Sequence, residues 1–130
     1  MTIDDLILAK AATPEEATAM LGRLSGRVHQ VITAFTIVGE LDDTPVHRDG
    51  IVATDVAVCT LDDDAIADYV ASGEWRGKAG AYAIQGIGAA LVRAVHGSVT
   101  NVIGLPLVEV LAALREVGGP APRFTAGTPR

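Results

Sequence analysis

Apolar residues recur with helical spacing in the stretch that follows Thr13. The Thr13 side chain can cap free backbone N–H groups, Pro14 suits the first helical position, and Glu16 stands three residues after the cap. Ser25-Gly26 then provides a stop signal. The pattern therefore predicts a helix between Thr13 and Ser25. The apolar stripe consists of Ala17, Met20, Leu21 and Leu24.

Two more helices are predicted further along the chain. The acidic run Asp62-Asp63-Asp64 opens one of them, and Ser72-Gly73 closes it. Pro106 begins the last helix, and Gly118-Gly119 ends it.

Two β-branched stretches predict strands. Val28 to Val38 is apolar on both faces, and Ile51 to Thr60 has a similar composition. The residues between them, Gly39 to Gly50, contain several turn formers, so we expect a turn region and a hairpin. The alternation in Ala89 to His96 favours a third strand over a helix.

The order of elements predicts one α/β or α+β domain built around a single sheet. A chain of 130 residues is long enough for one real core. Aromatic residues make up only 4% of it, so we expect a core of small, finely packed side chains rather than large rings. The domain is expected to span residues 1–117, and residues 118–130 are expected to form a disordered tail.

Charge and composition restrict the partners. The formal net charge is −6, and the eight Arg and two Lys are scattered, which argues against nucleic acid or an anionic membrane as the main partner. Any anion site must therefore be local. Cys59 is the only cysteine, so no intramolecular disulfide can form. The sequence shows no secretory leader and no apolar run of about 20 residues, and we expect a cytoplasmic protein.

A search for common catalytic and ligand-binding motifs retains one segment as a candidate binding site. The three histidines lack the spacing of metal ligands, and Asp62-Asp63-Asp64 is better explained as a helix start than as a cation site. The glycine-rich residues 77–88 contain Lys78, Tyr82 and Gln85. Glycines let a backbone approach a ligand closely. The alternative is a tight turn that packs Tyr82 into the core.

Four ordered segments resemble motifs of one family. Residues 24–33 resemble LSGRxHxVxT, residues 68–74 contain YVASGE, residues 78–86 resemble KAGAYGIQG, and residues 101–107 resemble NVVGLPL. Together they resemble the Maf family of nucleoside triphosphate pyrophosphatases, over nearly the whole chain up to about Val117.

The resemblance implies an α/β fold with a mixed sheet flanked by helices. It also implies hydrolysis of a nucleoside triphosphate, dTTP or UTP or modified pyrimidine nucleotides, to the monophosphate and pyrophosphate, with Mg²⁺ or Mn²⁺ assisting. By the same resemblance, Gln85 would contribute to substrate selection, Lys10 would bind phosphate, and Lys78 would help form the pocket wall. The alternatives are a loop cap for Gln85, a solvated side chain for Lys10 and a surface charge for Lys78.

The departures from the family pattern also matter. The catalytic Asp of the family would fall a few residues before Met1, so no catalytic residue is assigned; Asp4 and Asp5 match the turn after that strand instead. Gly77 replaces the Asp that usually precedes the KAG lysine. We therefore weigh a piece of a longer protein against a short homologue that binds nucleotide or a partner subunit without hydrolysis. A structural oligomerisation module is a third reading. An uncovered sheet edge would favour a homodimer or aggregation, which light scattering would detect.

Overall fold

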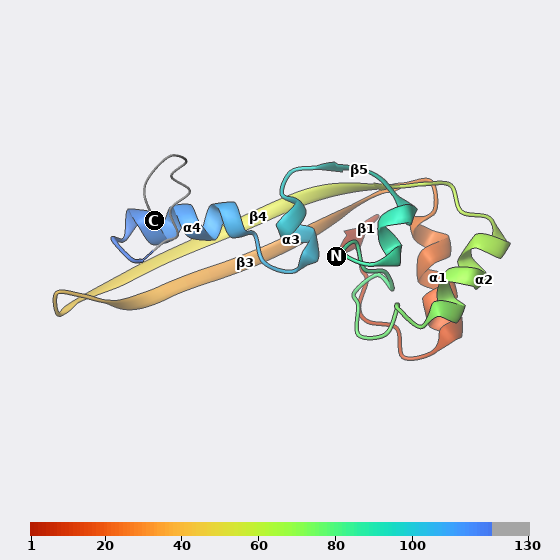
Figure 1. The fold of residues 1–130 in the computed structure, drawn as a ribbon, viewed down its shortest axis with the longest axis horizontal. Helices are drawn as coiled ribbons and strands as arrows, with labels where there is room; N and C mark the ends of the chain where they lie inside the picture. Colours follow the sequence, from red (N-terminus) through yellow and green to blue (C-terminus); the bar gives the residue numbers. More distant parts are fainter. Residues whose placement is uncertain (121–130) are drawn as a thin grey trace, which may run out of the picture.

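Two long strands make up most of the sheet. A computed structural model describes residues 1–120 of the chain. Strands β3 (Val28–Leu41) and β4 (Thr44–Val58) pair as an antiparallel hairpin that runs the length of the molecule (Figure 1). The complete sheet has five strands in the order β2-β1-β3-β4-β5. The three short strands are β1 (Thr2–Ile3), β2 (Leu6–Ile7) and β5 (Val92–His96).

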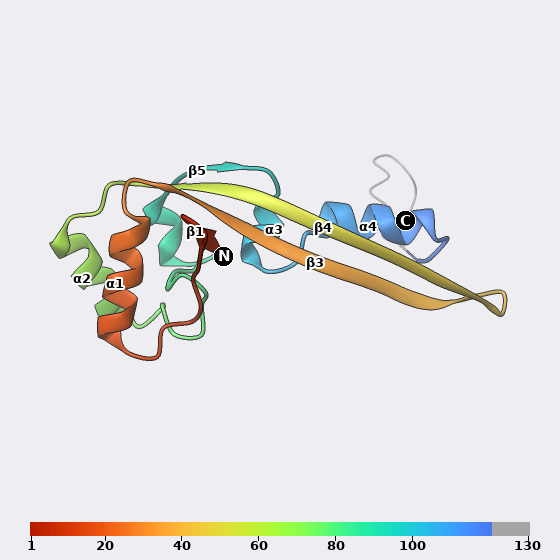
Figure 2. The same cartoon turned by 180° about the vertical axis from the view of Figure 1, so that it is seen from behind.

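The helices occupy two regions around this hairpin. Helices α1 (Pro14–Leu24) and α2 (Asp63–Ser72) lie together at one end. Helices α3 (Val99–Ile103) and α4 (Leu107–Glu116) lie along one face of the hairpin, which passes in front of α4 when seen from behind (Figure 2). A short 3₁₀ helix, η1 (Ile87–Leu91), precedes β5.

The predicted α/β class, with a sheet flanked by helices, is confirmed. The sheet differs from the mixed one that we expected, because every pair of neighbouring strands in the described part of the chain is antiparallel. Two-residue turns join β1 to β2 and β3 to β4, and a connection this short permits only antiparallel pairing.

The helix starts follow the sequence signals. Glu16 N donates to Thr13 Oγ1 at 3.2 Å, and the Glu16 carboxylate accepts from Ala12 N at 2.8 Å. Asp62 caps α2 by accepting from Ala65 N at 2.8 Å. Each cap satisfies a backbone N–H that has no partner inside its helix, which explains why these starts could be predicted.

The predicted turn region from Gly39 to Gly50 is wrong. Pairing continues without interruption to Leu41 opposite Thr44, and only Asp42 and Asp43 form the turn. Both have positive φ, 51° and 63°, a conformation that Asp tolerates better than most residues and that suits the twist of a two-residue hairpin. The several turn-forming residues between 39 and 50 suggested a long loop, but the chain turns only at Asp42 and Asp43.

The same turn chemistry occurs at the start of the chain. Asp4 and Asp5, with φ of 48° and 62°, connect β1 to β2. Their assignment to a turn is confirmed. Strands β1 and β2 and the short helix α3 were not predicted, because two to five residues are too few to show a period.

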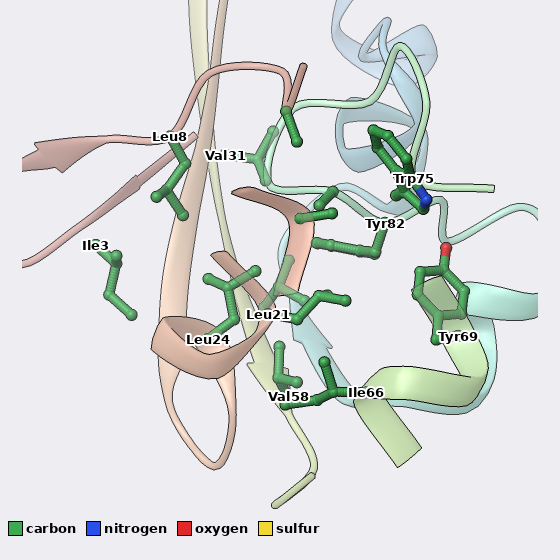
Figure 3. Packing of buried hydrophobic residues seen from close by; sticks show 14 residues of the cluster. Ile3, Leu8, Leu21, Leu24, Val31, Val58, Ile66, Tyr69, Trp75 and Tyr82 are labelled. Atoms are coloured by element: carbon green, nitrogen blue, oxygen red, sulfur yellow. The ribbon is translucent and has the colours of Figure 1, made fainter. Parts of the chain in front are cut away.

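The core lies where α1 and α2 meet the paired ends of β3 and β4 (Figure 3). Leu21 and Leu24 of α1 are buried, and so are three aromatic rings. The expectation of a core without large rings is therefore wrong. The rings, Tyr69, Trp75 and Tyr82, come from the end of α2 and the loop that follows it. Within residues 1–120, no helix is long and apolar enough to cross a bilayer. Most of the predicted tail, residues 121–130, lies outside the described residues.

Candidate functional site

A pocket of about 330 Å³ lies between strand β3 and two later segments of the chain. One wall comes from residues 31–33 of β3, another from the glycine-rich residues 77–85, and a third from residues 101–104 at α3. Met1 also contributes to the lining. The walls combine apolar side chains with amide, hydroxyl, ammonium and backbone polar groups in about equal share.

Two of the three predicted site residues line this pocket. Lys78 and Gln85 stand on the glycine-rich wall, seven residues apart in sequence, and the side chain of Gln85 makes no hydrogen bond within the described part of the chain. The ammonium of Lys78 is close enough to Glu74 to contribute to the lowered pKa of that carboxyl group, but forms no direct ion pair with it. The pocket thus contains an amide and a cation that are available to a ligand.

Lys10 lies beside this wall rather than in it. Its backbone forms an isolated antiparallel bridge with Ala79, and Gly80 N donates to Ala9 O at 3.2 Å. Lys10 is exposed and is not among the lining residues. The structure therefore brings the backbones of the two lysines of the chain close together, because Lys10 is bridged to Ala79 and Ala79 directly follows Lys78.

Tyr82 is placed as the tight-turn alternative predicted, and it also borders the pocket. It is buried in the core and also lines the pocket. Its hydroxyl lies 2.8 Å from Nε2 of His29, and the two rings meet edge to face with centroids 5.5 Å apart. Burial raises the pKa of Tyr82, whereas burial and the charge of the N-terminus lower the pKa of His29 to about 4. Both side chains are therefore neutral at pH 7.

Asn101 is a pocket residue that the sequence reasoning did not single out. It is 0% exposed, and the two N–H groups of its Nδ2 are shared among three acceptors: Val31 O at 3.0 Å, Val52 O at 3.2 Å and Thr54 Oγ1 at 3.0 Å. These bonds join α3 to both long strands and fix the third wall of the pocket. The only signal for it was its place at the head of the NVIGLPL segment, because a lone Asn has no period to reveal it.

The described residues do not fit a divalent metal. Mg²⁺ and similar hard cations take carboxylate and carbonyl oxygens, usually with at least one carboxylate. No Asp, Glu, His or Cys is among the pocket-lining residues of the described chain. Nowhere in residues 1–120 do three such side chains come together as a metal site would require. We therefore assign no chemical step to a metal.

The arrangement suits a flat heterocycle attached to an anion. Apolar walls can enclose the ring, the amide of Gln85 can hydrogen-bond to its edge, and the lysines supply local positive charge in an otherwise acidic chain. Such a site can bind and orient a nucleotide. Catalysis would in addition require a group that activates water, which none of the pocket-lining residues offers as a carboxylate or an exposed imidazole.

The chain is similar to known proteins over most of its length. Residues 1–117 match the Maf family, described as Maf-like protein. A dTTP/UTP pyrophosphatase of Anaeromyxobacter dehalogenans strain 2CP-1 is 47% identical over 116 residues, covering 89% of this chain and 60% of the relative. A protein of the same name from Syntrophotalea carbinolica is 46% identical over 115 residues, covering 88% and 51%. Another, from Escherichia coli O157:H7, is 48% identical over 108 residues, covering 83% and 53%.

The chain thus spans between half and three fifths of the length of these relatives. The match nevertheless covers nearly all of the described residues, including all three walls of the pocket. The chain belongs to the Maf family.

Proposed function

We propose that this chain forms the base-binding part of a cytoplasmic site that hydrolyses dTTP and UTP to the nucleoside monophosphate and pyrophosphate. In this reaction, water attacks the α-phosphorus, the bond to the oxygen that bridges the α- and β-phosphates breaks, and pyrophosphate leaves. The observation that carries the proposal is that Gln85 and Lys78 line the same pocket. The names of the relatives support the substrate class.

Gln85 is proposed to select the base. Thymine and uracil share an edge on which one N–H donor lies between two carbonyl acceptors. A primary amide carries both an acceptor and a donor, so it can pair with the N–H and one neighbouring carbonyl together. The apolar wall formed by Val31, Ile32 and Ile84 would accommodate the ring.

The two lysines are proposed to face the phosphates. A triphosphate is strongly anionic, and the chain carries a net charge of −6, so a local cation is needed to bind it. Lys78 lines the pocket. Lys10 is bridged to Ala79, the residue that follows Lys78 in the sequence. The names of the relatives lend no support to the alternative of a homologue that binds nucleotide without hydrolysis.

The test is pyrophosphate release from dTTP and UTP by the 130-residue chain, with Mg²⁺ or Mn²⁺ in the buffer. Gln85→Ala is expected to lower kcat/KM by at least about tenfold, because both hydrogen bonds to the base are lost at about 0.5–1.5 kcal/mol each. Gln30→Ala is the matched control, because Gln30 does not line the pocket and bonds to Asp55 at 3.3 Å across the hairpin. It is expected to leave the rate within twofold.

Thermal stabilisation by dTTP, measured in parallel, separates binding from turnover. A folded chain that is stabilised by dTTP but releases no pyrophosphate would support the base-binding part and contradict hydrolysis by these 130 residues alone. A chain that shows neither effect would contradict the nucleotide site itself.

A further inference from the structure

One hydrogen-bond network connects α2 to the segment that carries Gln85. Tyr69 lies near the end of α2, and its hydroxyl donates to Glu74 Oε1 at 2.6 Å. The same hydroxyl accepts from Ala83 N at 3.1 Å. Glu74 in turn accepts from two backbone N–H groups, Ile87 N at 2.8 Å and Gly88 N at 2.7 Å. We name this pair of side chains, Tyr69 and Glu74, the brace.

The brace fixes the glycine-rich segment on both sides of Gln85. Ala83 is bound two residues before Gln85, and Ile87 and Gly88 are bound two and three residues after it. Gly86 N also donates to Ala83 O at 3.2 Å, so Gln85 lies in a tight turn on the pocket wall. Gly86 fits this geometry, because a Cβ there would lie only 2.7 Å from the carboxyl carbon of Glu74.

The end of α2 sets the position of the brace. Gly73 ends the helix with φ of 77°, and Glu74 N donates to Ser72 Oγ at 3.3 Å. The Trp75 ring is buried, and its Nε1 donates to Val70 O at 2.9 Å. Glu74 is thus held between a helix end and a buried ring, so its carboxylate has little freedom to follow the loop. The carboxylate bonds the loop from this anchored position.

The hydrogen bonds of the brace require an ionised Glu74 and a protonated Tyr69, and the pKa shifts of both groups favour these states. The hydrogen bond from Tyr69 and the two backbone N–H groups lower the pKa of Glu74, against the opposing effect of burial. Burial, followed by the hydrogen bond to Glu74, raises the pKa of Tyr69. At neutral pH the carboxylate is therefore ionised and accepts all three bonds, and the phenol remains a donor.

We propose that Tyr69 and Glu74 are positioning residues that determine base selection by fixing the orientation of Gln85. Neither residue lines the pocket, so neither touches the nucleotide. The inference rests on the proposed function of Gln85, since it concerns how that amide is aimed. It adds two residues outside the pocket to those that set specificity.

The first experiment measures the brace without any activity. Amide hydrogen exchange at Ile87 and Gly88 is compared between the native chain and Glu74→Ala. The exchange rates of these two amides are expected to rise at least tenfold, because their only acceptor is removed. Glu15→Gln, an exposed change on α1, is the matched control and is expected to leave them unchanged. Unchanged exchange in Glu74→Ala would overturn the brace itself.

The second experiment tests whether the brace acts through Gln85. Tyr69→Phe and Glu74→Gln are each expected to lower kcat/KM for dTTP by about three- to tenfold. Glu74→Gln is expected to be the milder change, because an amide oxygen in place of Oε1 still accepts from Tyr69 and from Gly88 N, and only the bond from Ile87 N is lost. In a Gln85→Ala background, the same changes are expected to have less than a twofold further effect.

The outcomes distinguish the two proposals. An effect of equal size in the Gln85→Ala background would show a general structural role and would overturn positioning through Gln85. A native chain that releases no pyrophosphate while Glu74→Ala raises amide exchange would contradict the proposed function but retain the brace.

Discussion

Gly88→Ala is expected to lower the free energy of unfolding by about 3 kcal/mol, the upper end for atoms forced into a packed site. Gly88 is buried at the start of η1, where the glycine-rich segment folds back on itself. A Cβ there would overlap the carbonyl oxygen of Ala83 and would lie 2.9 Å from both the carbonyl carbon and the nitrogen of that residue. All three are backbone atoms, so no side-chain rotation can relieve the overlap. The loop must move, and its bonds to Glu74 would be strained with it.

Gly22→Ala provides the matched control for this change. Gly22 lies inside α1, and a Cβ there would meet nothing within 4 Å. Alanine is a better helix former than glycine, so this variant is expected to be more stable by about 0.5–1 kcal/mol. Urea unfolding followed by circular dichroism measures both changes. If Gly88→Ala unfolds at the same urea concentration as the native chain, the described approach of Gly88 to Ala83 is wrong.

The stability of the protein is expected to fall as the pH drops from 7 to 4, mainly because of His29. Burial and the N-terminal charge lower the pKa of His29 from 6.5 to about 4 in the folded chain. Between these two values the unfolded chain binds the proton and the folded chain does not, so acid favours unfolding. The full window corresponds to about 3 kcal/mol, which is present above pH 6.5 and lost by pH 4. The Glu74 carboxyl also has a lowered pKa, but its contribution is lost below its ordinary value of 4.5.

Urea unfolding at pH 7 and pH 5 checks this expectation. His29→Gln is expected to abolish most of the difference between the two pH values. His96→Gln is expected to retain it, because His96 is exposed on β5. A titration of the imidazole by NMR gives the same answer without a variant. A midpoint for His29 near 6.5 in the folded chain would contradict both the burial effect and the predicted slope.

The parts of the fold that could be predicted from the sequence are those governed by local chemistry. The Thr13 and Asp62 caps and the helical stripe of α1 predict their helices, because the interacting groups lie within a few residues of each other. The full length of the β3–β4 hairpin could not be predicted. Pro45 and Gly50 signalled a break, but Pro45 stands beside the turn and Gly50 is covered by the ring of Phe35 across the hairpin.

Some residues of the candidate site could also be identified from the sequence, and others could not. The glycine-rich segment drew attention to Lys78 and Gln85, but their roles, and Lys10 altogether, came from the resemblance of their segments to family motifs. The structure places the first two in one pocket and the third beside it. His29, Asn101 and Glu74 stand in segments that resemble family motifs, but their roles could not be predicted, because their partners Tyr82, Val31 and Gly88 lie 53, 70 and 14 residues away. Contacts of this kind follow from the tertiary fold and leave no period or local motif.

The three walls of the pocket also have a consequence for the order of folding. The long hairpin closes from a two-residue turn, so its first pairs join residues that are almost neighbours and cost little chain entropy. The pocket instead requires residues 31–33, 77–85 and 101–104 to meet, across loops of more than 40 and about 15 residues. During synthesis, the hairpin is complete once residue 58 is available, whereas the third wall is made much later. We therefore expect a nascent chain to contain its longest structural element well before its pocket is complete.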